Sequence, residues 1–485
     1  MEKKCFEAFL NVLLSLPKHD VLWVTVHTAQ YTASGRNRKQ HRCYKLNRYL
    51  PPGSAAPQPQ QTFPMLSPSA SFHGVLVAAA AGWLGLASCA HRDAPAAPTA
   101  PPGGADTVAA TAVRWQPGTL PATGAPASLI VPAAQLTPLR VRRTGPAVFK
   151  SNNPEIFTGA GWLMQNAGTG RGTARGGRAM PLTGKNVIYL FHINRSGAAK
   201  YVHVLAAAAG PAATRVAYRG ACFTNATYPL TGAATGQSYH VAKAWLTGDL
   251  PLSGTTPDLT PGALHELVKV RMNQANMIDG RLEVTSTQPT LYYVVATDNG
   301  TPAEAQAAAQ GAFAPGEFYP EDRNRFGREA GLYATSEATA AHTLDLPAET
   351  AYAGFCLNTT NKFVPALEDQ TADSLMTLRT AASRTYGNYG HCYRLTFTLR
   401  NPGRAARRVQ AYFASNATDP ARPNATWNGP IRCDNTVFDV YTTFSAPRVP
   451  LSAWSVPAGG RLSATVEFYV PGLITTNQQL ILQAD

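Results

Sequence analysis

The stretch that decides the fold is YRLTFTLRNPGRAARRVQAYF, residues 393–413. Its first seven residues alternate large apolar side chains with Arg and Thr, which is the period of a half-buried β-strand. The residues from Asn401 to Gly403 are typical of a turn, and residues 408–413 again favour a strand. The stretch therefore predicts a strand, a turn and a returning strand.

Strand-like segments of the same kind follow one another along most of the chain. The clearest are residues 186–193, 200–205, 214–218, 267–272, 281–285, 291–296, 436–443 and 461–469. Short strands at such spacing are typical of β-sandwiches. Residues 301–310 predict a short helix instead, because Thr301 suits a cap, Pro302 suits the first turn and the interior is rich in Ala. We therefore predict an all-β fold of two Ig-like β-sandwich blocks with a loop-rich, partly helical connection.

The two blocks resemble each other in the order of their strands and turns. Residues 201–218 match residues 393–412, since both contain a strand, a Gly turn and a second strand. Residues 260–270 match residues 457–466 in the same way. We therefore predict that the blocks are related. The predicted boundaries are 135–300 for the first block, 301–385 for the connection and 386–485 for the second block.

The composition suits an exported β-protein. Hydrophobic residues make up 45% of the 485 residues, enough for a sizeable core, and charged residues only 14%, below the usual quarter. The 40 glycines and 38 prolines indicate many turns. The formal net charge is +14, of which only +8 falls from residue 89 onward. That part is mildly basic, and we predict no nucleic-acid partner.

A leader-like segment ends at Cys89. Residues 75–87 are apolar, too short to cross roughly 30 Å of hydrocarbon as a helix and suited to a signal peptide. The four residues from Leu86 to Cys89 then resemble a bacterial lipobox, in which the cysteine is acylated and becomes the new N-terminus. The alternative is a buried helix with an incidental cysteine, and the lack of Lys or Arg in residues 66–74 weakens the leader signal. We predict a lipoprotein-type signal peptide in residues 65–88, lipidation at Cys89 and a Pro/Ala-rich linker in residues 89–134.

Residues 1–64 precede this leader and form a doubtful N-terminal extension. They carry a basic run in residues 36–48 and a Pro/Gln tract in residues 51–61. Because a signal peptide acts from the N-terminus, Met65 is the expected start, and the extension is then an over-long reading of the gene. The alternative, a nucleic-acid arm, would be removed before export.

Three motifs stand out in the exported part: SNNPE at 151–155, HINRSG at 192–197 and YGNYG at 386–390. In this order they resemble a domain-of-unknown-function family of exported β-rich proteins found mainly in cyanobacteria. The similarity runs from about Thr144 to the C-terminus. The resemblance implies an exported β-rich protein and implies no activity.

The densest acidic cluster lies in the loop 317–329. It contains Glu317, Glu321, Asp322 and Glu329 beside aromatic residues. Two such carboxylates could hydrolyse a glycoside, and oxygen ligands on a loop could hold calcium. Three arginines interleave with them, so a solvated, salt-bridged loop is the alternative. Glu317, Glu321 and Asp322 are the residues that a hydrolase would use.

Four cysteines follow Cys89, and Cys392 and Cys433 are the predicted disulfide because they lie in one block of an exported chain. Buried free thiols are the alternative. No Cys-x-x-Cys spacing occurs, and His265-Glu266 lacks the second His of a zinc helix, so we predict no metal and no cofactor. The Gly/Arg stretch 168–178 lacks the Lys-Ser/Thr of a phosphate-binding loop and predicts a cationic surface loop.

These features predict an exported, lipid-anchored protein with a binding or structural role at the bacterial cell envelope. It would lie at the outer membrane, facing the periplasm, or be secreted, and would contact the membrane through the lipid alone. The predicted partner is a cell-surface polysaccharide or an envelope protein, held by exposed aromatics such as Trp245 or Trp427. A second set of candidate contacts is the arginine group around one turn, Arg400, Arg404, Arg407 and Arg408. We expect no enzyme; the alternative is a glycan-acting hydrolase that uses the 317–329 loop.

The lipobox is tested at the mature N-terminus. In a bacterial host, the most N-terminal peptide of the membrane-bound protein should begin with an acylated Cys89, and Cys89→Ser should block both acylation and cleavage. Mass spectrometry of the purified protein measures this. An abundant, unmodified peptide beginning at Met1 would defeat the lipoprotein assignment.

Overall fold

The computed structural model of the chain describes residues 24–30, 38–44, 112–168, 178–226, 228, 230–378, 381–422 and 424–485. Two compact units are present, residues 1–101 and residues 102–485. In the first unit, strands β1 (Val24–Gln30) and β2 (Arg38–Tyr44) form an antiparallel pair. Cys89 and the predicted leader at 65–88 lie outside the described residues, as does most of the predicted extension and of the stretch 168–178. No helix in the described ranges is long and apolar enough to cross a membrane.

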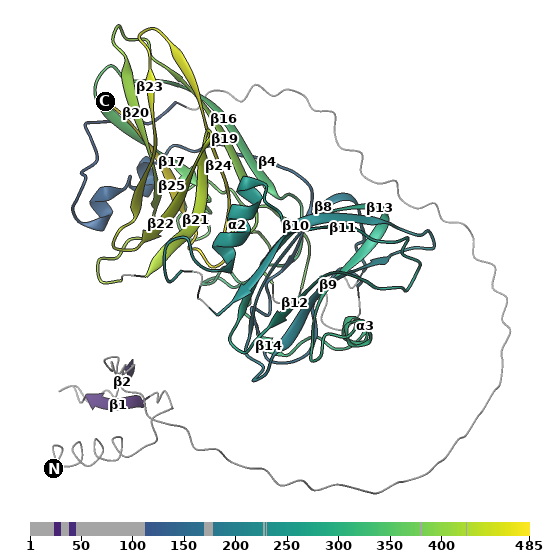
Figure 1. Ribbon diagram of the computed structural model, residues 1–485. Helices are drawn as coiled ribbons and strands as arrows, with labels where there is room; N and C mark the ends of the chain where they lie inside the picture. Colours follow the sequence, from purple (N-terminus) through teal and green to yellow (C-terminus); the bar gives the residue numbers. More distant parts are fainter. Residues whose placement is uncertain are drawn as a thin grey trace, which may run out of the picture. The chain divides into compact units, whose positions relative to one another are not determined.

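The second unit is mostly β-structure, and its C-terminal part is a sandwich of two sheets (Figure 1). One sheet has the order β22 (Thr436–Thr443), β21 (Ala425–Cys433), β24 (Arg461–Tyr469), β19 (Cys392–Arg400), β16 (Glu337–Asp345) and β4 (Arg142–Thr144). The facing sheet has the order β23 (Arg448–Val456), β20 (Arg407–Ser415), β25 (Gln478–Ala484), β17 (Ala351–Leu357) and β3 (Gln116–Pro117). Large buried side chains such as Phe397, Phe413 and Trp427 fill the core between them. The predicted all-β class is confirmed.

The N-terminal part is a second sandwich, made from a single twelve-stranded sheet. One layer contains β11 (Leu252–Thr255), β10 (Val216–Asn225), β13 (Met277–Thr297), β8 (Leu182–Asn194) and β5 (Val148–Ser151), and continues into β15 (Ala330–Tyr333) and β18 (Ser374–Thr377). The other layer contains β12 (His265–Met272), β9 (Lys200–Ala208), the second half of β13 and β7 (Gly161–Gln165). The short pair β6 (Ile156–Phe157) and β14 (Gly316–Glu317) extends β8. β13 serves both layers, because its first half pairs with β10 and β8 and its second half pairs with β9 and β7.

The two sandwiches repeat the same strand order. The order β11-β10-β13-β8-β5 in the first corresponds to β22-β21-β24-β19-β16 in the second, and the order β12-β9-β13-β7 corresponds to β23-β20-β25-β17. In each sandwich the fourth and fifth strands of the first order are parallel, while their neighbours are antiparallel. The single long strand β13 occupies the positions that β24 and β25 occupy in the second sandwich. The sandwiches are therefore related, as predicted.

The observed correspondence between the strands of the two sandwiches is shifted by one strand from the predicted correspondence. β8 and β9 correspond to β19 and β20, so residues 182–208, and not 201–218, match the stretch at 393–413. Two turn asparagines confirm this register, because the amide of Asn194 donates to the carbonyls of Ala198, Met272 and Asn273. The amide of Asn401 donates in the same pattern to Ala405, Val456 and Pro457. The alignment made from the sequence was wrong because residues that are common in turns occur in both stretches. The pairing partners of the strands give the correct alignment.

The stretch at 393–413 is not a hairpin. β19 pairs with β16 and β24, whereas β20 lies in the facing sheet and pairs with β23 and β25. The loop between them crosses from one sheet to the other over a core that is about 10 Å thick in such sandwiches. The alternation predicted both strands correctly, but the returning strand faces its predecessor across the core.

Strand membership does not follow the predicted boundaries. β3 and β4 come from the chain before the first sandwich, yet they pair with β17 and β16 of the second. β16 and β17 fall within the predicted connection and belong to the second sandwich. In the opposite direction, β18 lies between β17 and β19 along the chain but pairs with β15 of the first sandwich. These exchanged strands tie the two sandwiches together.

Two α-helices occur among the described residues of the second unit. α3 (Pro302–Gln310) is the predicted one, and Thr301 with Glu304 forms a capping box at its start. α2 (Gln237–Thr247) was not predicted. It begins after Gly236 and ends at Gly248, and its buried residues include Tyr239, Val241 and Trp245. It packs against β10 and β13 of the first sandwich and against β21 and β24 of the second.

The turn asparagines should be stabilising. Asn401→Ala leaves buried carbonyls without a donor, so the free energy of unfolding should fall by about 1–3 kcal/mol, and Asn194→Ala should behave alike. Asn324→Ala, in an exposed loop, is the control and should change little. Urea unfolding of the full chain measures each change, and an Asn401→Ala loss no larger than the control's would contradict this role.

Candidate functional site

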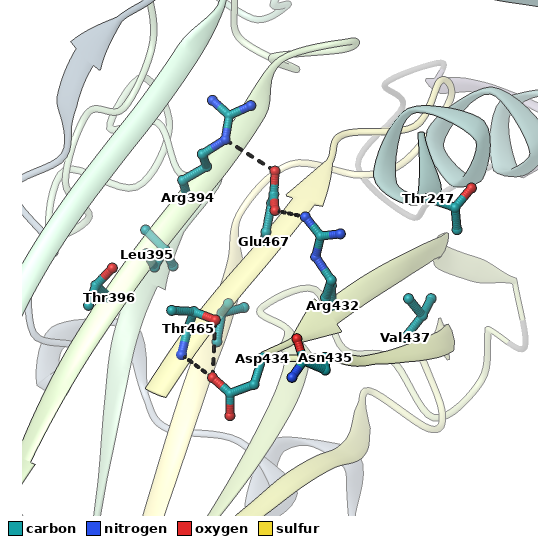
Figure 2. A pocket seen from close by; sticks show the side chains of 11 residues that line it. Thr247, Arg394, Leu395, Thr396, Arg432, Asp434, Asn435, Val437, Thr465 and Glu467 are labelled. Atoms are coloured by element: carbon teal, nitrogen blue, oxygen red, sulfur yellow. Dashed lines mark hydrogen bonds and ion pairs between the residues drawn. The ribbon is translucent and has the colours of Figure 1, made fainter. Parts of the chain in front are cut away.

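A groove of about 570 Å³ lies on the outer face of the second sandwich, beside the end of α2 (Figure 2). It is lined by Thr247, Arg394, Leu395, Thr396, Arg432, Asp434, Asn435, Val437, Thr465, Val466 and Glu467. The volume falls within the range of roughly 300–1,000 Å³ that is usual for small-ligand sites. Most of the lining is polar, so the groove suits a ligand rich in hydrogen-bonding groups.

Strand alternation brings these side chains together. In β19 the apolar residues face the core, which turns Arg394 and Thr396 outward. In β24 the same rule turns Thr465 and Glu467 outward. The register places Thr396 opposite Thr465, and Arg394 opposite Glu467. The sequence already showed this alternation; the pairing of the two strands, which it did not show, makes the site.

Glu467 lies between two arginines. Its Oε1 accepts a hydrogen bond from Arg394 Nε at 3.1 Å, and its Oε2 pairs with Arg432 Nη2. Arg394 also pairs with Glu337 at 2.8 Å, and Arg432 donates to the carbonyl of Leu246 in α2 at 2.9 Å. The two guanidiniums therefore have fixed orientations. The side chain of Arg394 is 44% exposed and that of Arg432 is 35% exposed. They are preorganised to donate to a ligand.

Asp434 closes the other end of the groove, in the tight turn between β21 and β22. Its φ is +52°, a left-handed conformation that Asp and Asn tolerate better than most residues. The carboxylate accepts hydrogen bonds from Thr465 N at 2.7 Å and from Trp454 Nε1 at 2.8 Å. Asn435 follows it in the turn and is exposed. A fixed acceptor and a free amide thus face the two arginines along the groove.

The first sandwich carries the same ion pair at the equivalent position. Glu283 is the seventh residue of β13, as Glu467 is of β24, and each pairs with an arginine of the adjacent strand, Arg219 or Arg432. In the first sandwich this face is partly covered, because the ring of Trp245 in α2 packs on Arg281, with the ring centre 4.0 Å from Arg281 Cζ. In the second sandwich the same face is left open. The groove is therefore the uncovered copy of a repeated surface.

The aromatic side chains predicted to contact a ligand are buried instead. Trp245 is 7% exposed and packs between the sandwiches, and Trp427 is 0% exposed in the core. Of the four arginines around the 401–406 loop, Arg404 is exposed and the other three, Arg400, Arg407 and Arg408, have protein partners. Arg400 pairs with Asp345 at 2.6 Å, and Arg407 donates to the carbonyls of Ala348 and Glu349. Neither set forms the groove.

The three carboxylates assigned to a hydrolase have separate local partners. Glu317 accepts from Tyr319 Oη, and Asp322 pairs with Arg325 in its own loop. Glu321 accepts from Lys362 Nζ at 2.6 Å, Ser383 N at 2.6 Å and Tyr386 Oη at 2.7 Å. Burial alone would raise the pKa of Glu321, but these hydrogen bonds lower it to about 2. Such a carboxylate is saturated and ionised, which does not suit a general acid.

The predicted Cys392–Cys433 disulfide is wrong. Both thiols are free, and they lie on opposite sides of β24, next to Tyr469 and Val466, respectively. Two strand spacings of about 4.8 Å separate their strands, more than a disulfide spans. The groups of His, Cys, Asp and Glu within the described ranges include none that could hold a metal ion.

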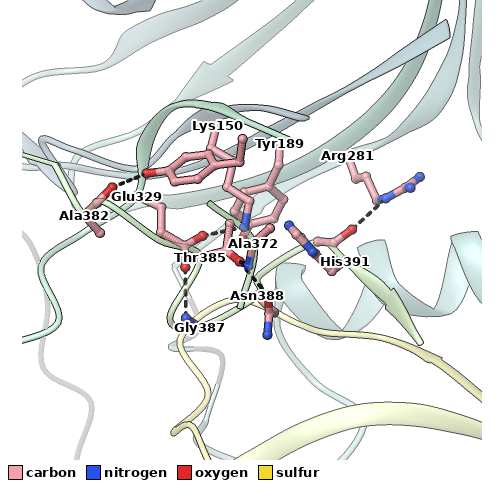
Figure 3. A network of polar contacts seen from close by, with 12 residues as sticks. Lys150, Tyr189, Arg281, Glu329, Ala372, Ala382, Thr385, Gly387, Asn388 and His391 are labelled. Carbon is pink, nitrogen blue, oxygen red and sulfur yellow. Dashed lines mark hydrogen bonds and ion pairs between the residues drawn. The ribbon is translucent and has the colours of Figure 1, made fainter. Parts of the chain in front are cut away.

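The YGNYG motif forms a buried junction (Figure 3). Gly387 N donates to Glu329 Oε1 at 2.9 Å, and Glu329 pairs with the fully buried Lys150. Asn388 donates to Asn358 at 3.0 Å. The Gly390 carbonyl accepts from Arg281 Nε at 2.8 Å. The motif therefore connects β5, β13 and the second sandwich, and its role is structural.

No protein-family model matches the chain, and no curated protein matches it. Among solved structures, the N-terminal CBM22-1-CBM22-2 tandem domain of Xyn10C from Paenibacillus barcinonensis is 10% identical, with 68% of this chain and 90% of that chain covered and a TM-score of 0.14. Lac15 from a marine microbial metagenome is 10% identical, with coverages of 60% and 52% and a TM-score of 0.10. Fet3p, a multicopper oxidase that functions in iron import, is 9% identical, with coverages of 58% and 50% and a TM-score of 0.11. Likenesses this weak carry no argument about function.

The buried carboxyl of Asp279, near the start of α2, should make stability depend on pH. Burial raises its pKa to about 7, against the opposing hydrogen bonds of Ser238, Tyr189 and Gly472 N. An unfolded Asp titrates near pH 4, so between about pH 4 and pH 7 the unfolded state has lost a proton that the folded state keeps. This group therefore destabilises the fold progressively as pH rises through that window, and its effect levels off above pH 7.

Asp279→Asn should remove this dependence. The free energy of unfolding of the variant minus that of the wild type should rise between about pH 4 and pH 7 and then stay constant. Urea unfolding at a series of pH values measures the difference, in which the other titrating groups cancel. A difference that does not change with pH would contradict the assignment.

Proposed function

We propose that the chain is an exported, lipid-anchored protein of the cell envelope that binds a neutral polysaccharide in the groove beside α2. The observation that carries the proposal is the set of fixed, partly exposed hydrogen-bonding groups on one sheet face: Arg394, Arg432, Asp434, Asn435 and Glu467. The anchor rests on the lipobox-like sequence that ends at Cys89.

Sugar hydroxyls both donate and accept hydrogen bonds, so a site for them needs donors and acceptors side by side. The guanidiniums of Arg394 and Arg432 supply donors, and the carboxylates of Asp434 and Glu467 supply acceptors. Two positive and two negative charges balance within this lining, which favours a neutral glycan over an anionic one. The open face admits a chain that continues beyond the groove, as a polysaccharide does.

Binding is favoured over hydrolysis for a specific reason. The alternative required two carboxylates acting together on the 317–329 loop, and Glu321 there is ionised and saturated with donors. In the groove, Glu467 is held by two arginines, which keeps it a hydrogen-bond acceptor. Glu321 therefore does not suit the general-acid role in glycoside cleavage.

Removing one groove arginine should weaken glycan binding. Arg394→Ala should lower affinity by about 10-fold or more, because hydrogen bonds to charged groups contribute roughly 1.5–3 kcal/mol. Arg400→Ala is the matched control, since Arg400 lies on the same strand and face, has a comparable ion pair and lies outside the groove. It should bind as the wild type does. Affinity electrophoresis of the full chain in gels of neutral and of acidic polysaccharides measures both.

Three outcomes would overturn the proposal. One is the absence of any retardation in the neutral gels. The second is an equal loss in both variants, which would indicate unspecific attraction to charge. The third is retardation only in the acidic gels, which would assign the surface to an anionic ligand.

A further inference from the structure

Lys150 and Glu329 form a fully buried pair that no binding or catalytic role uses. Their side chains are 0% and 3% exposed, and Lys150 Nζ contacts Glu329 Oε2 (Figure 3). Lys150 lies on β5 beside Tyr189 of β8 and opposite Gly331 of β15, and Glu329 immediately precedes β15. The pair therefore joins neighbouring strands of the first sandwich, on the face that is buried at the YGNYG junction.

The surroundings of this pair are buried and partly aromatic. Lys150 Nζ lies 5.6 Å from the ring centre of Tyr189 and 5.9 Å from that of Tyr333. Both tyrosine hydroxyls are used elsewhere, since they donate to Asp279 and to the Ala382 carbonyl. An ammonium offers three donors, and Glu329 is the acceptor that the structure places beside this one. Burying a charged pair costs free energy, and an amide in its place would carry no charge.

We propose that Lys150 Nζ and Glu329 Cδ are joined by an amide bond that forms after folding. The contact already brings the nucleophile against the carboxyl group. The other carboxyl oxygen, Oε1, accepts a hydrogen bond from Gly387 N at 2.9 Å. That donor is placed to stabilise the negative charge that develops on Oε1 when the amine attacks.

The step balances without any co-reactant. Passing the ammonium proton to the carboxylate gives a neutral amine and a neutral carboxylic acid. Nζ then attacks Cδ, the C–N bond forms, and one amine proton moves to the departing Oε2, which leaves as water. No oxidation or reduction occurs. Burial lowers the pKa of Lys150 to about 8, which is consistent with an available neutral amine.

The same chain contains a pair that should stay unjoined. Lys362 Nζ lies 2.6 Å from Glu321 Oε1, but these side chains are 15% and 20% exposed. Glu321 also accepts hydrogen bonds from Ser383 N and Tyr386 Oη, and its pKa is about 2. An ionised carboxylate resists attack by an amine, so Lys362 and Glu321 serve as an internal control.

A tryptic digest of the denatured full chain tests the bond directly. An amide at Lys150 blocks cleavage there, so mass spectrometry should find residues 144–171 joined to residues 329–362, at a mass lower by one water than the sum of the two peptides. Cleavage after Lys362 in that product shows that the control pair is free. Separate linear peptides 144–150 and 329–362, with no branched product, would overturn the proposal.

Two variants sharpen the result. Lys150→Arg removes the amine and should yield only linear peptides. Glu329→Gln should still form the bond by losing ammonia instead of water, and so give a branched peptide of the same mass as the wild type. A branched peptide that persists in Lys150→Arg would also overturn the assignment. The inference does not depend on glycan binding, because the pair lies at the YGNYG junction and takes no part in lining the groove.

Discussion

The guanidinium of Arg281 is the contact on which the joining of the two sandwiches depends. It is 1% exposed, lies over the rings of Trp245 and Tyr469 and donates to the Gly390 carbonyl. A buried cation costs stability unless its surroundings compensate, and here two aromatic faces and a carbonyl do so. Its partners come from α2, from β24 and from the YGNYG motif. If these segments moved apart, the charge would be left buried without partners.

The exchanged strands act together with this contact. β3 and β4 reach forward to the second sandwich, and β18 reaches back to the first. Each adds hydrogen bonds to an edge that would otherwise expose unpaired backbone groups. Residues 102–485 therefore form one compact unit, although they contain two copies of one sandwich. The YGNYG motif lies at the centre of this junction.

The repeat of the sandwich also explains why the groove lies on the second sandwich and not on the first. Asp279, Arg281 and Glu283 face α2 and the second sandwich, so this side of the first copy is buried or partly covered. The equivalent residues of β24, Ser463, Thr465 and Glu467, face outward, and Thr465 and Glu467 line the groove. The first copy thus uses the surface to assemble the molecule, and the second copy leaves the same surface exposed. The proposed glycan site follows from this division.

Local sequence determined the elements that depend on local physics. Alternating side chains predicted the strands at 393–399 and 461–469, and the Thr301 cap with its Ala-rich interior predicted α3, because periodicity and capping act within a few residues. Long-range pairing decided the rest. It placed β19 and β20 in opposite sheets, set Cys392 and Cys433 on opposite sides of β24, and aligned Arg394, Arg432 and Glu467 in one groove. These outcomes depend on which distant strands share hydrogen bonds and which face the core covers. Neither the pairing of distant strands nor the choice of the covered face can be read from a single short stretch of sequence. Only the tertiary structure therefore decided these outcomes.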